Sequence, residues 1–428
     1  MKNIIPLGVK IKQIRVFKGF SQESIANSID STVMRVSRIE RGQTECDKAT
    51  LNAIKKALEI ENAPLTEHEL EVYKSRLWVW YETINIKGVP EARDMQNDLF
   101  PITALPFIDE IAMLYSMIET RILSLEGDIL AAEERLDAAK AYVSEANNDV
   151  SNELKFLYIR NKGFVYNAHG QYEKALVLYM KLLELERNVI KPGPDILSGI
   201  GFLHCNMGRP FCAIWYFEKA LSGLKDDFIS IRKSDIGISL GECYMMVGGI
   251  TKAKALLETS LTHARSLNNK ASIGRALSSL GYLYTLTESY DKALKYCGDA
   301  LEYLQDNTEL YITALYNKAN CLQKMKEFER CADVLTEGKT LAEGNEGLVI
   351  LLETVNHVMN IKDDGAADFL ENEAIPFLRK GVHRHIALHI CEMLEQYYKK
   401  RGAQRKALLI AVTSRDIMKE MAYGDCWI

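Results

Sequence analysis

Residues 279–301 read SLGYLYTLTESYDKALKYCGDAL, and this segment carries the pattern on which the fold depends. Its small residue Gly281 is followed, twelve residues later, by Ala293. The same layout occurs in GIGFLHCNMGRPFCAIWYFEKAL, residues 199–221, and in NKGFVYNAHGQYEKALVLY, residues 161–179. Self-similarity at a fixed period is the signature of a repeat protein.

The small residue recurs at a nearly constant spacing of 38, 40, 40 and 38 residues, at Gly163, Gly201, Gly241, Gly281 and Ala319. Twelve residues after each stands Ala175, Ala213, Ala253, Ala293 or Cys331, and four further on Tyr179, Phe217, Leu257, Cys297 or Leu335. The pattern resembles the tetratricopeptide (TPR) repeat, in which small residues let the two helices of a pair pack closely. Its period exceeds the ordinary one of about 34 residues, which predicts longer helices or turns.

Weaker copies extend the array in both directions. The register fits Trp80 with Ala92, Thr120 with Ala132, the segment around His357, and Glu395 with Ala407. We therefore predict about nine helix pairs over residues 66–425, stacked into a right-handed superhelix with a concave inner surface. The fold class is predicted to be all-α.

The N-terminal sixty residues follow a different pattern. Apolar residues at helical spacing predict four short helices, which pass through Leu7 to Ile14, Gln22 to Ala26, Val33 to Arg41, and Leu51 to Leu58. Ser21 and Thr32 are placed to cap the second and third helices, and Gly42 to end the third. Two short helices joined by a tight turn form a helix-turn-helix.

Two stretches, SQESIA at residues 21–26 and VSRIERG at residues 36–42, resemble the Cro/C1-type (XRE) helix-turn-helix family. Asp30 and Ser31 depart from the family pattern, which favours glycine and an apolar residue there. The resemblance implies a DNA-binding domain over residues 1–62, followed by a TPR domain over residues 63–428.

In this family the third helix enters the major groove of double-stranded DNA. The resemblance implies that the base edges are met by Val33, Met34 and Arg38. It implies that phosphate groups are met by Gln22, Thr32 and Arg35. The alternative is that Arg35 and Arg38 only solvate an exposed helix face. Because one such helix offers little affinity, we expect dimers on paired half-sites, held together by the body of the protein.

The charge distribution agrees with a DNA-binding head. The chain has a net charge of −5, but residues 1–60 carry eleven basic and six acidic residues, so the head is +5 and the rest −10. Nine scattered cysteines without a C-x-x-C pair are typical of free thiols. No membrane span or signal peptide is recognisable, and we expect a cytoplasmic protein.

The sequence contains no recognisable catalytic or cofactor-binding motif. It has no Walker loop, no G-x-S-x-G and no HExxH, so we predict neither an enzyme nor a cofactor. His383, His385, His389 and Cys391 include a pair at helical spacing, which metal sites use. No further ligands are fixed near them and the segment reads as ordinary repeat helix, so we predict no metal site.

The whole arrangement, a helix-turn-helix followed by long-period TPRs, resembles the peptide-responsive regulators of the Rap, Rgg, NprR, PlcR and PrgX group, and most closely the NprR and PlcR branch. The resemblance implies quorum sensing, with a short signalling peptide held in the concave groove and dimers or tetramers that change geometry on binding. Projection of the repeat register onto the first helix of each pair predicts these peptide-binding residues: Arg121, Arg160, Asn161, Asn167, Asn206, Glu242, Tyr282, Tyr316, Asn317 and Asn320.

Within this set, Asn161, Asn317 and Asn320 are assigned to the peptide backbone, because the family uses asparagines of the first helix in this way. Arg121 and Arg160 can hold a carboxylate. The alternative for each residue is a polar side chain that faces solvent. The short linker Glu61–Thr66, which contains Pro64, is expected to transmit movement of the body to the head.

Two other functions remain open. The Rap side of the group implies a TPR module that acts on a phosphorelay response regulator, alone or in addition to DNA binding. A scaffold that binds DNA constitutively would show no response to any peptide.

Overall fold

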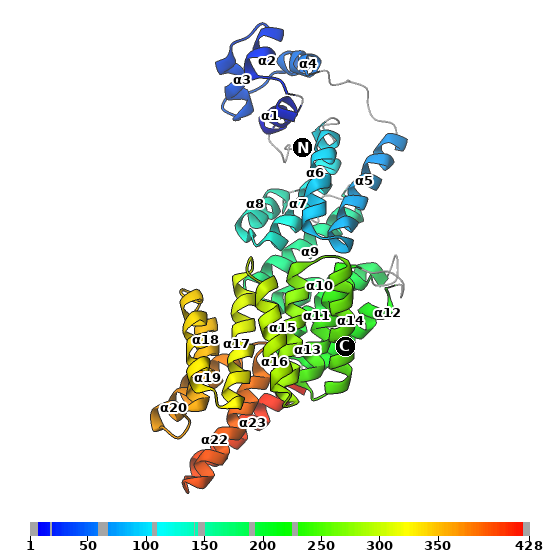
Figure 1. The fold of residues 1–428 in the computed structure, drawn as a ribbon. Helices are drawn as coiled ribbons and strands as arrows, with labels where there is room; N and C mark the ends of the chain where they lie inside the picture. Colours follow the sequence, from blue (N-terminus) through cyan, green and yellow to red (C-terminus); the bar gives the residue numbers. More distant parts are fainter. Residues whose placement is uncertain are drawn as a thin grey trace. The chain divides into compact units, whose positions relative to one another are not determined.

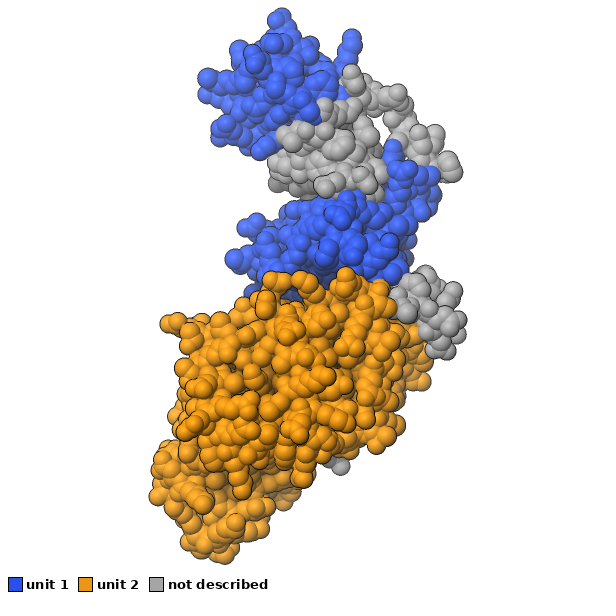
Figure 2. Space-filling view, viewed as in Figure 1, with its two compact units in different colours: residues 1–182 blue, residues 183–428 orange. Residues whose placement is uncertain are grey.

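The computed structural model describes residues 7–17, 19–58, 67–104, 109–140, 142–143, 150–187, 193–224 and 230–422. Every regular element in these ranges is a helix, which confirms the predicted all-α class. The chain divides into two compact units, residues 1–182 (unit 1) and 183–428 (unit 2) (Figure 2). The predicted boundary between residues 62 and 63, with the linker around Pro64, lies outside the described residues. The division into domains 1–62 and 63–428 therefore stays a prediction.

Four short helices at the start of unit 1 have nearly the predicted bounds: α1 (Leu7–Phe17), α2 (Gln22–Ser28), α3 (Val33–Glu40) and α4 (Lys48–Ala57). The hydroxyl of Ser21 accepts a hydrogen bond from the N–H of Ser24, as predicted for a helix cap. Thr32 accepts one from the N–H of Arg35 in the same way. The buried core of these helices contains Ile11, Ile14, Ile25, Ala26, Val36, Ile39, Ile54 and Leu58.

The turn between α2 and α3 depends on a residue with a positive φ. Asp30 has φ +51°, a left-handed conformation that the short polar side chain of aspartate tolerates. Gly42, with φ +69°, follows α3, and its N–H donates to the carbonyl of Ile39. The departure from the family pattern at Asp30 therefore changes the residue but keeps a left-handed turn.

The rest of the described chain consists of helix pairs, whose first members we call A helices and second members B helices (Figure 1). The pairs are α5 (Glu67–Ile86) with α6 (Val89–Ala104), α7 (Asp109–Glu126) with α8 (Ile129–Lys140), α9 (Asn152–Ala168) with α10 (Tyr172–Arg187), α11 (Pro194–Asn206) with α12 (Pro210–Ser222), α13 (Ile231–Met246) with α14 (Ile250–Ser266), α15 (Lys270–Leu286) with α16 (Tyr290–Tyr303), α17 (Thr308–Met325) with α18 (Phe328–Leu341), α19 (Glu346–Met359) with α20 (Asp364–Phe369), η1 (Leu370–Ala374) and α21 (Ile375–Leu378), and α22 (Arg384–Lys400) with α23 (Gln404–Ala422). The outer copies predicted around Trp80, Thr120, His357 and Glu395 all lie in A helices of such pairs.

The repeated small residue is required by the packing of each A helix on its B helix. A Cβ added at Gly201 would lie 2.7 Å from the ring of Phe217, which is the residue sixteen positions later. Gly163, Gly241 and Gly281 stand in the same relation to Tyr179, Leu257 and Cys297, with added Cβ atoms 2.5 to 2.9 Å from those side chains. Real Cβ atoms do not approach other atoms this closely, so the spacing read from the sequence records a steric requirement.

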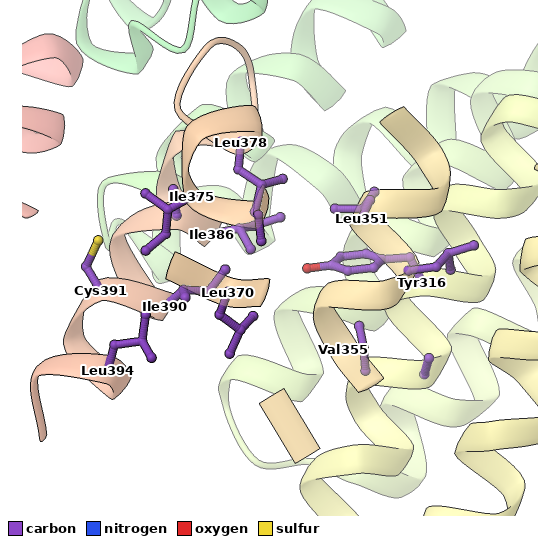
Figure 3. Close-up of a cluster of buried hydrophobic side chains, with 14 of the residues drawn as sticks. Tyr316, Leu351, Val355, Leu370, Ile375, Leu378, Ile386, Ile390, Cys391 and Leu394 are labelled. Atoms are coloured by element: carbon purple, nitrogen blue, oxygen red, sulfur yellow. The ribbon is translucent and has the colours of Figure 1, made fainter. Parts of the chain in front are cut away.

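The eighth pair has a broken B helix, in which α20 and α21 flank the π-helical turn η1. Pro376 follows the turn and lacks a backbone N–H, which accounts for the lost helical hydrogen bond. This segment covers the core of unit 2, where Tyr316 and Leu351 face Leu370 and Ile386 (Figure 3). No helix among the described residues is long and apolar enough to cross a membrane.

Candidate functional site

The outward face of α3 combines apolar side chains with the basic side chain of an arginine. Met34 is 64% exposed and Val33 43% exposed, and Arg38 is also exposed. Val36 and Ile39, on the opposite face, are fully packed in the core. Such a surface can place methyl and methylene groups against thymine methyls and a guanidinium against guanine.

The predicted phosphate-contacting residues already have partners within the protein. The Arg35 guanidinium lies 3.4 Å from the carboxylate of Asp47 and donates to the hydroxyl of Thr50. The side-chain amide of Gln22 donates to Glu40 at 2.6 Å. Gln22 and Arg35 are thus held at the ends of α2 and α3.

A buried ion pair, which the sequence analysis did not identify, joins α1 to α3. The Arg15 guanidinium donates to both carboxylate oxygens of Glu40, at 2.5 and 3.0 Å, and to the carbonyl of Phe20. Only 2% of Glu40 is exposed. Arginine and glutamate inside otherwise apolar helix faces are the signal that could have revealed the pair. It fixes the orientation of the helix that carries Met34 and Arg38.

The predicted peptide-binding residues fall in both units, so each set is described separately. In unit 1 two arginines lie over aromatic rings, Arg121 4.7 Å from the ring centre of Phe164 and Arg160 5.5 Å from that of Tyr81. Arg160 is only 3% exposed. Stacking on an aromatic ring is a favourable arrangement for a guanidinium group and fixes its orientation.

Asn161 of α9, which follows Arg160 in the sequence, is completely buried. Its amide nitrogen donates to the carbonyl of Met117 on α7 at 2.6 Å, across two A helices. Its Oδ1 atom is buried and has no hydrogen-bond partner among the described residues. Asn167, further along α9, is half-buried. A buried acceptor without a donor is costly, so Oδ1 of Asn161 stands out as an unsatisfied polar atom of α9.

In unit 2, Asn317 stands two positions before the repeated small residue, as Asn161 does in unit 1. Its side chain makes the corresponding contact with the preceding A helix. Its amide donates to the carbonyl of Ser278 on α15, at 3.3 Å, and to the hydroxyl, at 2.9 Å. Tyr316 is 6% exposed and belongs to the core in Figure 3, and burial raises the pKa of its hydroxyl. The Asn320 amide donates to the carbonyl of Tyr316 in its own helix. The structure thus places Tyr316 in the core and uses Asn317 to join neighbouring A helices.

Glu242 is paired with a basic residue that the sequence analysis did not identify. Arg275 of α15 donates to both carboxylate oxygens of Glu242 and, at 2.8 Å, to the hydroxyl of Ser239. Burial opposes the charge on Arg275, but the negative charge of Glu242 outweighs it and raises the pKa of the guanidinium. Ser279 also donates to Glu242, at 2.8 Å. Glu242 therefore has little capacity left to bind a cation.

Similar polar contacts join the A helices α11, α13 and α15. Arg232 lies 2.8 Å from Asp195, and Ser272 donates to Asp235 at 2.7 Å. Burial raises the pKa of Asp235. The same repeat position, six residues before the repeated small residue, holds Asp195, Asp235 and Arg275. A comparison of charged residues at equal repeat positions could therefore have found these contacts between A helices.

The histidines considered as metal ligands have other surroundings. His385 contacts the ring of Tyr282 edge to face, with centroids 6.5 Å apart, and His389 lies beside Glu392. Burial lowers the pKa of His383 and of His385 to about 4, and raises that of Tyr282 to about 12. Across the described residues, no three His, Cys, Asp or Glu side chains are grouped as metal ligands. Asn206, at the end of α11, is half-buried.

The fold is similar to that of known peptide-sensing proteins. The apo form of the quorum sensor NprR from B. thuringiensis is 21% identical, with a TM-score of 0.61 over 82% of this chain and 100% of that chain. NprR in complex with its cognate peptide NprX matches at the same identity and TM-score, over 81% and 99% of the chains. A Rap protein complexed with Competence and Sporulation Factor is 14% identical, with a TM-score of 0.65 over 82% and 99%. No protein-family model and no curated protein sequence matches the chain.

Proposed function

We propose that this protein is a DNA-binding transcription regulator whose activity is switched by a short signalling peptide bound by its A helices. The protein shares the fold of the NprR and Rap proteins, and NprR has been solved with its cognate peptide. The proposal has two parts, a DNA surface on α3 and a peptide site on the array.

The observation that carries the DNA part is the exposed face of α3. Val33 and Met34 are adjacent and exposed on the helix that also presents Arg38, so this face offers apolar contacts beside a positive charge. The buried pair of Arg15 and Glu40 and the caps at Ser21 and Thr32 hold α3 rigidly. A rigid helix with Val33, Met34 and Arg38 outward fits the recognition helix of a helix-turn-helix.

The peptide part rests on the polar groups of the A helices. Oδ1 of Asn161 lacks a donor, and the stacked guanidinium groups of Arg121 and Arg160 suit a carboxylate. A peptide has backbone N–H groups that can donate to such an acceptor, and a terminal carboxylate that an arginine can bind. No catalytic role enters this proposal.

We further propose that the protein acts as a homodimer. One helix-turn-helix reads a single half-site, and dimers gain affinity from two half-sites about one DNA turn apart. The peptide then changes DNA binding if it favours one spacing of the two heads over another.

A second candidate function is action on a phosphorelay response regulator. The observation in its favour is the fold similarity to a Rap protein. The two functions are compatible in one chain, since the α3 surface plays no part in the second.

The decisive experiment is a titration of the full-length protein against its own upstream DNA, at two salt concentrations. Each titration is repeated with a synthetic peptide encoded by a neighbouring small reading frame, and with the same peptide in scrambled order as control. We expect specific binding that weakens with salt, as phosphate contacts require, and that shifts only with the unscrambled peptide.

Specific DNA binding that ignores the peptide would contradict the switch and favour a constitutive scaffold. Absence of specific binding would contradict the DNA part, and loss of phosphate from a response regulator would then be measured.

A further inference from the structure

Residues 379–385, which we call the closing turn, connect α21 to α22 and contact helices far back in the same unit. In most repeat arrays each repeat touches only its neighbours. Here the closing turn and α23 contact α11 and α12, although four helix pairs lie between them in the chain. In unit 2, the pair α11 and α12 is therefore in contact with the last pair, α22 and α23.

The tightest part of this contact is at Gly208, in the turn between α11 and α12. A Cβ added there would overlap the carbonyl oxygen of Gly381 and lie 2.7 Å from Cδ of Arg384. On the other side, a Cβ added at Gly381 would lie 3.5 Å from the carbonyl oxygen of Asn206. The two backbones meet closely, with no room for a Cβ at Gly208 and ordinary van der Waals contact for one at Gly381.

The turn itself does not demand glycine at this repeat position. Gly208 has φ +65°, and the equivalent residues Gly248, Glu288 and Lys326 have φ of +80°, +57° and +63°. Glutamate and lysine thus hold the same left-handed turn in the later repeats. A Cβ at Gly248 would meet nothing within 4 Å. Gly208 differs from these equivalent residues because the closing turn packs directly against it.

Ion pairs hold the closing turn in shape. Arg384 donates to the carbonyl of Arg379 at 2.6 Å, and Arg379 pairs with Glu420 of α23 at 2.6 Å. Arg384 lies 3.7 Å from Glu420 as well. Val382 packs on the apolar cluster that α11, α12 and α13 share. The contact therefore involves both turns and the last helix pair.

The closing turn also reaches a predicted peptide-binding residue. His385 lies against Tyr282 of α15, and both residues are half-buried. A ligand at Tyr282 would touch the closing turn at the same time. Such a ligand binds better when the turn is in place than when it is away, and so favours the closed form.

We propose that the closing turn is a clasp that holds unit 2 closed, and that a ligand at Tyr282 is bound tightly only in the clasped form. The second half of this statement rests on the proposed peptide function, and the first half does not. The experiment measures the halves separately.

The first measurement is hydrogen exchange of the full-length protein without ligand. The variants are Gly208→Ala and, as a matched control, Gly248→Ala, which carries the same left-handed strain in open space. We expect exchange in residues 379–390 to quicken about tenfold in Gly208→Ala only. Arg384→Ala, which removes a partner without adding bulk, is expected to act in the same direction.

The second measurement is the affinity of the synthetic peptide for the same variants. We expect Gly208→Ala to weaken it about fivefold or more, while Gly248→Ala leaves it unchanged. Equal exchange in the two glycine variants overturns the clasp. Faster exchange in Gly208→Ala with unchanged peptide affinity overturns the coupling. If the wild type binds no peptide, the proposed function fails while the exchange result still decides the clasp.

Discussion

Single side chains on α3 distinguish the candidate DNA-contacting residues from one another. Val33, Met34, Arg35 and Arg38 are all exposed, but Arg35 also contacts Asp47 and Thr50. These two partners lie at the start of α4, where Asp47 caps the helix. Arg38 is thus a better candidate than Arg35 for a base contact.

The prediction at this scale is that Arg38→Ala weakens specific DNA binding by about 1–3 kcal/mol and relaxes specificity at one base pair. The same removal of charge at Arg265, an exposed residue of α14, is the control and should change nothing. Binding isotherms on operator and scrambled DNA measure both. Equal losses on the two DNAs would instead make Arg38 a phosphate contact.

Two asparagines that were predicted to bind the peptide backbone have a structural role in the fold. Asn161 and Asn317 stand at the same repeat position, and both donate to the carbonyl of the preceding A helix, at Met117 and Ser278. Their type and register predicted a role for the amide. The structure adds that the nitrogen is used to join helices, while the oxygen of Asn161 has no hydrogen-bond partner among the described residues.

At the scale of the element, a helix pair depends on the close approach of its A and B helices. Gly201 faces the ring of Phe217, and Gly298 of α16 faces no atom within 4 Å. Both glycines are inside helices, so both carry the same entropic cost relative to alanine.

We therefore predict opposite effects of one substitution at these sites. Gly298→Ala should stabilise the protein by about 0.5–1 kcal/mol, the ordinary gain for a helix interior. Gly201→Ala should destabilise it by about 1 kcal/mol, because overpacking of about 1–3 kcal/mol exceeds that gain. Thermal unfolding of the two variants beside wild type tests this. A stabilised Gly201→Ala would show that the steric account of the repeat is wrong.

The closing turn should make unit 2 sensitive to acid. Burial lowers the pKa of His383 and His385 to about 4, below the value of about 6.5 in an unfolded chain. The folded form therefore binds fewer protons in this interval. The stability is complete above about pH 6.5 and falls as the pH drops toward 4, by up to about 1.4 kcal/mol per pH unit for each histidine.

His385→Gln removes one of these titrations, so its unfolding temperature should depend less steeply on pH between 6.5 and 4.5. His389→Gln is the comparison: its pKa is lowered by burial too, but less than that of His385, so this substitution should change the slope less. Identical slopes for His385→Gln and wild type would mean that His385 is protonated in the folded protein.

At the scale of the whole molecule, a regulator of the proposed kind must couple two sites. Linkage requires that the factor by which a peptide changes DNA affinity equals the factor by which DNA changes peptide affinity. We expect equal factors of about 5 to 150 from the two titrations, each performed with the other ligand saturating. Unequal factors would reveal a change in assembly that one of the two ligands causes.

Much of the architecture is determined by the sequence itself, because it depends on contacts local in the chain. The caps at Ser21 and Thr32 and the partnership of Gly201 with Phe217 join residues at most sixteen positions apart, and such contacts leave a readable spacing. Only the tertiary structure decided the pairing of Arg15 with Glu40, the placement of Tyr316 in the core, and the meeting of Gly208 with Gly381. These contacts depend on how whole helices pack on one another. The packing angles are set by many residues together, so no short sequence motif indicates them.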